Sequence, residues 1–438
     1  MAFLQRKNLI FGGGERFPIL RDESGIPDFY ATLFTTVTLR PANKQNTIFN
    51  ALQAIVHLKL WEEMEGRDLI AEFSGGRFLS AEDVLAIRDH CALETRELRK
   101  WLTAVSQKKV VSIAGRVRRD TKDFNRVSKA HQSNRITHIA DYLAFSSRAL
   151  LRTRARYKEF LPQIENMRRQ LLAHRPKGVK RFSVSDPDLK APPPKVFDAL
   201  MEVVKEDNPE NPFKNPFVRL RNCLIFEIMY AAGFRAGEIL ALQIEDIDFS
   251  GKRIHIKRRH DNAVDPRRHQ PVVKTLERAI TVPEELVHKI RHYIMSVRAG
   301  VPGANKHPFV FVSHHAAKSS QGMPISDSAF RNRILAPATR TNPEIFDEVK
   351  RHGFRHNFNY RLSKRIDAQN ERAKKIPGVK KISEKEEMQI RMYLNGWKSE
   401  SSASIYNLRH VKEVADELML ADALEQGVNI SRGDGKHG

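Results

Sequence analysis

The sequence has almost no cysteine and no long apolar run. Cys91 and Cys223 are the only cysteines in 438 residues, which is too few for a disulfide framework or a thiolate metal cluster. No run of about 18 apolar residues that could span a bilayer is present. The first residues lack the apolar core and small-residue cleavage site of a secretory signal. We therefore expect a protein of the reducing cytoplasm with no membrane partner.

The sequence also lacks the usual signatures of cofactor binding. No glycine-rich loop followed by Lys-Ser or Lys-Thr is present, so a nucleotide-phosphate site is not expected. His314-His315 has no Glu-x-x-His or cysteine partner at ligand spacing, and the carboxylates are not clustered. We therefore expect neither a cofactor nor a metal.

Positive charge is what the chain has in excess. Lys and Arg number 75 against 52 Asp and Glu, for a formal net charge of +23. Such an excess favours a polyanion as partner, and nucleic acid is the commonest one. The alternative is a basic but merely soluble protein. Because 41% of the residues are hydrophobic, the chain can bury real cores, and its length suits two or three domains.

The first part of the chain is predicted to be helical. Residues 1–27, with glycines at 12–14 and little periodicity, are interpreted as a loosely ordered arm with at most one short strand. Apolar residues at helical spacing and a Ser80 N-cap signal then predict an all-helical domain over residues 28–173, with helices over 47–64, after 80 and over 127–152. Residues 174–192 lead into a triple proline at 192–194 and predict a linker.

A second domain is predicted over residues 193–426, followed by a mobile tail over 427–438. It opens with helices over 195–206 and 216–232, and helices dominate again towards its end. Three β signals lie between, at 253–257, 279–282 and 309–312, and the first two can pair across a long basic connection. The fold class is therefore mainly α, with a small antiparallel β-sheet (α+β) in the second domain.

Basic residues gather in the helical domain, with more at 152–158. A solvated face is one interpretation, but in a chain of this charge we favour phosphate contacts. The predicted DNA-binding residues are Lys108, Lys109, Arg116, Arg118, Arg119, Lys122 and Arg126.

Two motifs in the second domain carry side chains suited to phosphodiester chemistry. Arg235 and Glu238 lie in Gly-Phe-Arg-Ala-Gly-Glu, and His352 and Arg355 lie in His-Gly-Phe-Arg-His. A guanidinium matches two phosphate oxygens and stays charged at any working pH. His352 and Arg355, three positions apart, share one side of a helical turn and could reach the same phosphate. Glu238 could orient the turn or Arg235 itself.

A third motif supplies a nucleophile. Trp397 lies upstream of Tyr406 in Gly-Trp-Lys-Ser-Glu-Ser-Ser-Ala-Ser-Ile-Tyr. Cleaving a phosphodiester requires an in-line nucleophile, neutralisation of charge on the nonbridging oxygens and a proton for the leaving oxygen. Together the three motifs contain those parts, whereas any one alone would more simply be structural.

In the order and spacing of these motifs, the sequence resembles the tyrosine recombinase (phage integrase) family over about residues 190–424. The resemblance implies that Tyr406 attacks the scissile phosphate and forms a 3′-phosphotyrosine. It implies that Arg235 and Arg355 stabilise the transition state and that His352 assists proton transfer. Trp397 stands where many members have histidine, and it would pack on the phosphate or donate its indole N–H.

The resemblance also implies a lysine in the β-hairpin connection as general acid for the 5′ oxygen. Lys274, in Val-Lys-Thr before the second strand, is the best-placed candidate, and Lys257 at the start of the connection is the alternative. His356 is expected to support the site by packing. The chemistry needs neither metal nor ATP, because the bond energy is retained in the phosphotyrosine.

The sequence thus predicts a site-specific DNA recombinase or integrase that closes on double-stranded DNA as a C-shaped clamp. The resemblance implies a tetramer on two DNA sites, with the C-terminal helix docking on a neighbouring protomer or else on its own domain. An accessory directionality protein is a further candidate partner, and a prokaryotic or phage source is expected. The alternatives are a transposase, resolvase or type IB topoisomerase-like enzyme, a non-catalytic DNA-binding architectural or regulatory protein, and a metal-dependent nuclease.

Overall fold

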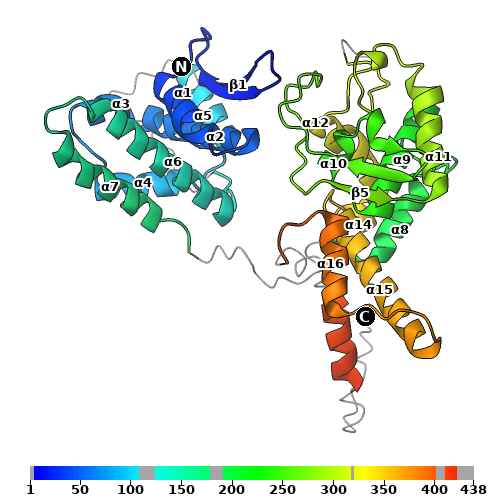
Figure 1. Ribbon diagram of the computed structural model, residues 1–438. Helices are drawn as coiled ribbons and strands as arrows, with labels where there is room; N and C mark the ends of the chain where they lie inside the picture. The colour runs from blue at the N-terminus through cyan, green and yellow to red at the C-terminus, as the bar shows by residue number, and fades with distance from the viewer. Residues whose placement is uncertain (1–3, 108–123, 178–190, 317–319, 401–409, 422–438) are drawn as a thin grey trace, which may run out of the picture. The chain divides into compact units, whose positions relative to one another are not determined.

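The computed structural model describes residues 4–107, 124–177, 191–316, 320–400 and 410–421. The described chain is mainly helical and divides into two compact units, one from residues 1–11 and 16–183, the other from 12–15 and 184–438 (Figure 1). Most of the predicted linker and all of the predicted tail lie outside the described residues. No helix in the described ranges is long and apolar enough to cross a membrane.

The first unit begins with a β-hairpin, so the prediction of a loosely ordered arm was wrong. Strands β1 (Gln5–Ile10) and β2 (Arg16–Arg21) pair antiparallel. Five consecutive residues of β2 are buried, including Phe17, Ile19 and Leu20, and the strand packs against helix α2. Because both faces of β2 are covered, its apolar residues do not alternate, and this hid the strand from periodicity analysis.

The predicted helices of the first unit are confirmed. The described part of residues 28–173 contains α1 (Phe29–Phe34), α2 (Gln45–Glu65), α3 (Leu69–Ser74), α4 (Ala81–His90), α5 (Thr95–Gln107), α6 (Lys129–Leu151) and α7 (Tyr157–Ala173). Ser80 caps α4 in a reciprocal capping box with Asp83, as its sequence predicts. Helices α2 and α6 pack together at the centre, burying Leu52, Ile55 and Ile139.

The second unit surrounds a three-stranded antiparallel sheet with helices. The sheet order is β3 (Ile247–Asp248), β4 (Arg253–Ile256), β5 (Arg278–Thr281). The principal helices are α8 (Pro194–Val203), α9 (Pro216–Ala232), α10 (Ala236–Leu240), α11 (Glu284–His292), α15 (Gly353–Lys375) and α16 (Glu384–Asn395), with shorter α12 (Asp327–Ala329), α13 (Ala336–Thr339) and α14 (Pro343–Phe346) between. Residues 410–421 form a further helix.

One predicted strand is not formed. Residues 309–312 are buried, but they make only isolated bridges, from Phe309 to Gln243 and from Val312 to Pro324. The third strand of the sheet is instead the two-residue β3. The apolar run reflects burial rather than sheet pairing, and periodicity alone cannot separate the two in so short a segment.

The long connection between β4 and β5 is fastened to the body of the second unit. Asp265 and Arg267 are both buried and form an ion pair at 2.8 Å. Arg267 also donates hydrogen bonds to the carbonyls of Leu240 and Ile325 and lies over the ring of Phe309. The residues between Arg267 and β5 therefore start from a position that is fixed on the body of the second unit.

Candidate active site

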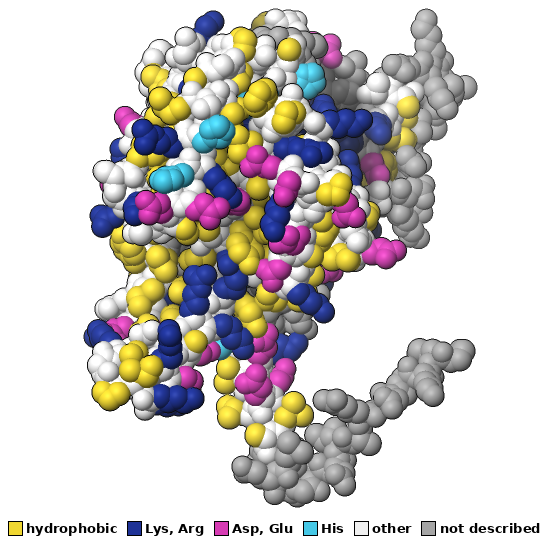
Figure 2. Space-filling view, turned by 90° about the vertical axis from the view of Figure 1, so that its right-hand side faces the viewer, with side chains coloured by type: hydrophobic (Ala, Val, Ile, Leu, Met, Phe, Trp, Pro, Cys, Tyr) yellow, Lys and Arg dark blue, Asp and Glu magenta, His cyan; other side chains and the backbone are white. Residues whose placement is uncertain are grey.

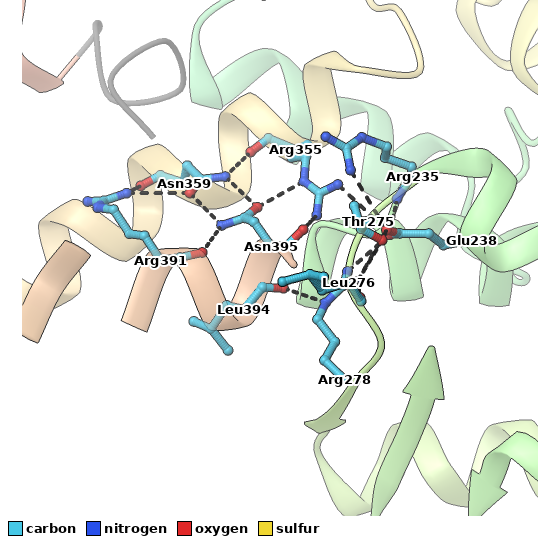
Figure 3. Close-up of polar contacts among 10 residues, drawn as sticks. All are labelled: Arg235, Glu238, Thr275, Leu276, Arg278, Arg355, Asn359, Arg391, Leu394 and Asn395. Atoms are coloured by element: carbon cyan, nitrogen blue, oxygen red, sulfur yellow. Dashed lines mark hydrogen bonds and ion pairs between the residues drawn. The ribbon is translucent and has the colours of Figure 1, made fainter. Parts of the chain in front are cut away.

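Glu238 is the centre of the site. Its side chain is 1% exposed, and its backbone lies in the first turn of α10. One carboxylate oxygen accepts a hydrogen bond from the backbone N–H of Arg235 at 2.9 Å, and Arg235 Nη1 lies 3.8 Å from the other. Arg355 Nη1 lies 3.8 Å from the same carboxylate. Glu238 therefore brings together the two arginines that the sequence singled out (Figure 3).

The turn that presents Arg235 depends on Gly233. This glycine ends α9 in the left-handed region, with φ of 63°, which most other residues disfavour. A Cβ atom there would lie 2.6 Å from the ring of Phe358. The close approach sets α9 against α15, so Arg235, which caps α10, and Arg355 on α15 are held in one framework.

Arg355 is held by the end of α16. The residue is 0% exposed. Its Nε donates to Asn395 Oδ1 at 2.9 Å and its Nη2 to the Asn395 carbonyl at 2.7 Å. Asn359 and Arg391 complete this buried network, in which Asn395 Nδ2 donates to Asn359 Oδ1 at 3.0 Å and Arg391 Nη1 to the Asn359 carbonyl at 3.2 Å. A guanidinium held this way is oriented before substrate arrives, as charge stabilisation in a transition state requires.

Burial alone would raise the pKa of Glu238, because the charged form loses its hydration. The Arg355 and Arg278 guanidinium groups, with hydrogen bonds from Arg278 and Thr275, outweigh that effect, and the net pKa is lowered. Glu238 is therefore a carboxylate at neutral pH, and its negative charge partly balances the surrounding cations.

The two candidate lysines have different surroundings. Lys257 Nζ lies 3.3 Å from Asp246 and 3.8 Å from Glu245. It therefore pairs with carboxylates other than Glu238. Lys274 is exposed between buried Val273 and Thr275, and Thr275 Oγ1 donates to Glu238 at 2.6 Å. The surroundings favour Lys274 as the lysine of the site.

His352 is the N-cap residue of α15 and is accessible to solvent. Partial desolvation of the ring lowers its pKa, and the positive charges of Arg351, Arg235, Arg355 and Lys274 lower it further. The imidazole is therefore neutral at neutral pH and able to accept a proton. The backbone carbonyl of His352 accepts a hydrogen bond from the Arg355 N–H at 3.1 Å, so the two residues are adjacent at the start of α15.

The remaining predicted residues are distributed as follows. Trp397 is 5% exposed and directly follows Gly396, the residue that ends α16. His356 is half-buried, one position after Arg355, and its backbone N–H donates to the His352 carbonyl. Tyr406 lies outside the described residues. Of the predicted DNA-binding residues, only Arg126 is described, and it is exposed; Lys108, Lys109, Arg116, Arg118, Arg119 and Lys122 lie outside the described ranges.

Sequence reasoning missed several residues of this network, including Thr275, Arg278 and Asn395. Arg278 opens β5, and Asn395 stands two positions before Trp397. Neither position carries a signal at helical or strand periodicity. The signal that could have found them is adjacency, because each is a polar residue close in sequence to Lys274 or Trp397.

Comparison with known proteins identifies the second unit. Residues 194–370 match the phage integrase family. The second unit therefore contains a phage integrase domain. The matched part of the integrase domain contains Arg235, Lys274, His352 and Arg355, and it ends before Trp397 and Tyr406.

The chain also has a curated relative. The chain is 25% identical over 183 residues to the tyrosine recombinase XerD of Halalkalibacterium halodurans, an overlap of 41% of this chain and 54% of that protein. The chain thus spans about half the length of the curated relative it matches.

Two solved structures are similar at low identity. One is the Tn1549 transposon integrase in complex with transposon right end DNA, at TM-score 0.43 and 14% identity, covering 86% of this chain and 92% of that chain. The other is the XerA recombinase, at TM-score 0.34 and 14% identity, with the same two coverages.

The lowered pKa of His352 gives a testable pH dependence in the integrase domain. If His352 accepts the proton of the nucleophile, the cleavage rate should fall as pH drops through the pKa of His352, because the protonated ring cannot act as base. Since that pKa is lowered, the acid limb should lie below the ordinary histidine range. His352→Gln should remove this limb and slow cleavage about 10²-fold.

The measurement is the single-turnover rate at which the covalent protein–DNA adduct forms, followed as a function of pH. His356→Gln is the matched control, because it removes a neighbouring imidazole and should keep the acid limb. An unchanged acid limb in His352→Gln would show that another group is titrating.

Proposed function

We propose that this protein is a site-specific DNA recombinase that cleaves and rejoins strands through a 3′-phosphotyrosine intermediate. The observation that carries the proposal is the buried Glu238 carboxylate, which gathers Arg235, Arg355 and the Lys274 loop around one point. Binding to DNA alone would not require two arginines to be aligned in this way. The family of the second unit and the basic charge of the whole chain support the same function.

In the proposed cleavage step the Tyr406 oxygen attacks phosphorus, and the bond from phosphorus to the 5′ oxygen breaks. The phenol proton passes to His352, and the Lys274 ammonium gives a proton to the leaving 5′ oxygen. Arg235 and Arg355 donate to the nonbridging oxygens, where charge accumulates. One phosphoester replaces another, so rejoining is the same step in reverse and needs no ATP.

The proposed partner is duplex DNA, bound mostly through phosphates and therefore with strong salt dependence. We further propose a tetramer on two sites. The helix of residues 410–421 supports it, with Val411, Leu418 and Met419 exposed, and apolar side chains are visible near the lower end of the second unit in Figure 2. The same helix is held on α15 of its own chain, where Tyr360 and Lys364 contact Glu413 and His410 contacts Asp367. Exchange between protomers would require these polar contacts to be released.

The test is adduct formation in excess chelator on nicked suicide substrates drawn from DNA flanking the gene. We expect a covalent protein–DNA adduct, mapped by peptide mass spectrometry to Tyr406, and none from Tyr406→Phe, which should still bind DNA. An adduct that persists in Tyr406→Phe would show that Tyr406 is not the nucleophile. Tight binding without any adduct would favour a non-catalytic DNA-binding protein, and cleavage that chelator abolishes would favour a metal-dependent nuclease.

A further inference from the structure

Arg278 is buried where three parts of the second unit meet. Its side chain is 1% exposed. Nη2 donates to Glu238 Oε2 at 3.1 Å, and Nη1 lies 3.3 Å from Glu238 Oε1 and 3.1 Å from Thr275 Oγ1. On its other side, Nε donates to the carbonyl of Leu394, near the end of α16, at 2.9 Å (Figure 3). One guanidinium thus joins α10, the segment after Lys274 and α16.

A second fastening lies beside the first. The backbone N–H of Leu276 donates to the carbonyl of Gly396 at 2.9 Å. Gly396 has φ of 62°, and a Cβ atom there would lie 2.8 Å from Arg278 Nη1 and 2.9 Å from Thr275 Cβ. The segment after Lys274 therefore packs closely against Gly396, where α16 ends and the chain continues to Trp397.

An arginine suits this position because of its geometry. Its planar fork reaches the Glu238 carboxylate, the Thr275 hydroxyl and the Leu394 carbonyl at once, while a lysine ammonium is a compact charge on a flexible stem. Arg278→Lys would keep the positive charge next to Glu238 and lose the geometry. The exposed Lys274 side chain would then stand on a segment with fewer fixed points.

We propose that Arg278 is a positioning residue for the leaving-group proton: it fixes the Lys274 segment against Glu238 and α16, so that the lysine is aligned with the 5′ oxygen. This inference rests on the proposed recombinase function. Arg278 does not touch the reacting atoms and acts through Lys274. The same contacts connect the Lys274 segment to the end of α16. The position of the proposed general acid is therefore fixed relative to the residues that lead to Trp397.

The chemistry of the leaving group separates this role from a structural one. Loss of an alkoxide from phosphorus needs a proton, and a positioned acid contributes about 10²–10⁴-fold to such a step. If sulfur replaces the bridging 5′ oxygen, the phosphorus–sulfur bond breaks and a thiolate leaves. Thiols are far more acidic than alcohols, with a thiol pKa of about 8.5 for cysteine, so that departure needs no proton donor. A variant that has lost only the alignment of the acid should recover on the sulfur substrate.

The experiment compares single-turnover adduct formation on matched suicide substrates with 5′ oxygen or 5′ sulfur at the cleaved bond. We expect Arg278→Lys to be slower than wild type by about 10²-fold on oxygen and to come within about threefold of wild type on sulfur. Lys274→Ala should show the same pattern. Arg235→Lys should be slow on both substrates, because charge on the nonbridging oxygens grows with either leaving atom.

Arg298→Lys is the matched control. Arg298 is another buried arginine of the second unit, and it donates to the carbonyls of Ala304, His307 and Phe309. It should match wild type on both substrates. Equal slowing of Arg278→Lys on oxygen and sulfur, or no slowing on either, would overturn the inference.

If Arg278→Lys fails to fold, Thr275→Val decides the matter. That change keeps the side-chain shape and removes the hydroxyl that bonds Glu238 and Arg278. It should slow the oxygen substrate more than the sulfur substrate, and equal effects on both would again overturn the inference. A wild-type protein that forms no adduct on either substrate would instead reject the proposed function itself.

Discussion

Arg355→Lys is expected to slow covalent adduct formation about 10³-fold. Removing a single preorganised donor to a developing oxyanion costs about 10²–10³-fold, and this change also disturbs the network that holds the donor. Lysine cannot replace both the Nε and Nη2 contacts to Asn395, so the new ammonium would be poorly directed as well as differently shaped. DNA binding should change little, because it depends on many phosphate contacts.

The measurements are the single-turnover cleavage rate and a salt-dependent DNA-binding isotherm. Arg361→Lys is the matched control, since Arg361 lies on the same helix and stacks over Tyr230 at 3.7 Å. It should cleave at close to the wild-type rate. If both variants lost cleavage activity equally, the loss would be due to disturbed packing of α15 and not to removal of the Arg355 guanidinium.

Glu238→Gln is expected to destabilise the second unit by about 3–5 kcal/mol, the cost of removing one partner from a buried ion pair. Glutamine fits the same space but leaves Arg235, Arg278 and Arg355 facing one another without a balancing charge. Cleavage should fall by at least as much as in Arg355→Lys, because Arg235 and Arg355 both lose the carboxylate that holds them in place. Denaturant unfolding and the adduct assay measure the two effects.

The pH dependence of that stability has a definite sign. The pKa of Glu238 is lower in the folded chain than in the unfolded one, so the unfolded state binds more protons as pH falls. The contribution of ionised Glu238 to folding stability is fully present at pH values above the ordinary glutamate pKa. It is lost as the pH falls through the lowered pKa of the folded state. The stability gap between wild type and Glu238→Gln should therefore narrow in acid. Glu284→Gln removes an exposed pair with Lys252 and should leave the stability at neutral pH close to that of wild type, because exposed ion pairs contribute little.

The sequence was informative where a residue's role depends on its near neighbours. The Ser80 capping box, the helix over 47–64 and the two paired strands at 253–257 and 279–282 all follow from local pattern, and the structure contains them. The buried strand β2 and the buried run at 309–312 were misassigned, because continuous burial removes the alternation on which a strand prediction depends.

The predicted site residues illustrate a different limit. Arg235, His352 and Arg355 could be named from motifs, and their neighbours in space could not. Asn395 lies 40 residues from Arg355 in sequence, and Arg278 lies 116 residues from Leu394. Such contacts are set by how α16 packs on α15 and β5, and nothing in either local segment encodes the distance. The roles assigned to the site residues remain predictions for the experiments above.

The Asp265–Arg267 anchor bears on how this chain tolerates change in length. The entropic cost of closing a loop grows only slowly with its length, so extra residues between β4 and Asp265 would add little to the free energy of folding. They would also be separated from Lys274 by a buried ion pair. A change of length before the anchor is therefore expected to disturb the lysine less than a change within the six residues after it, 268–273, which connect the anchor to Lys274.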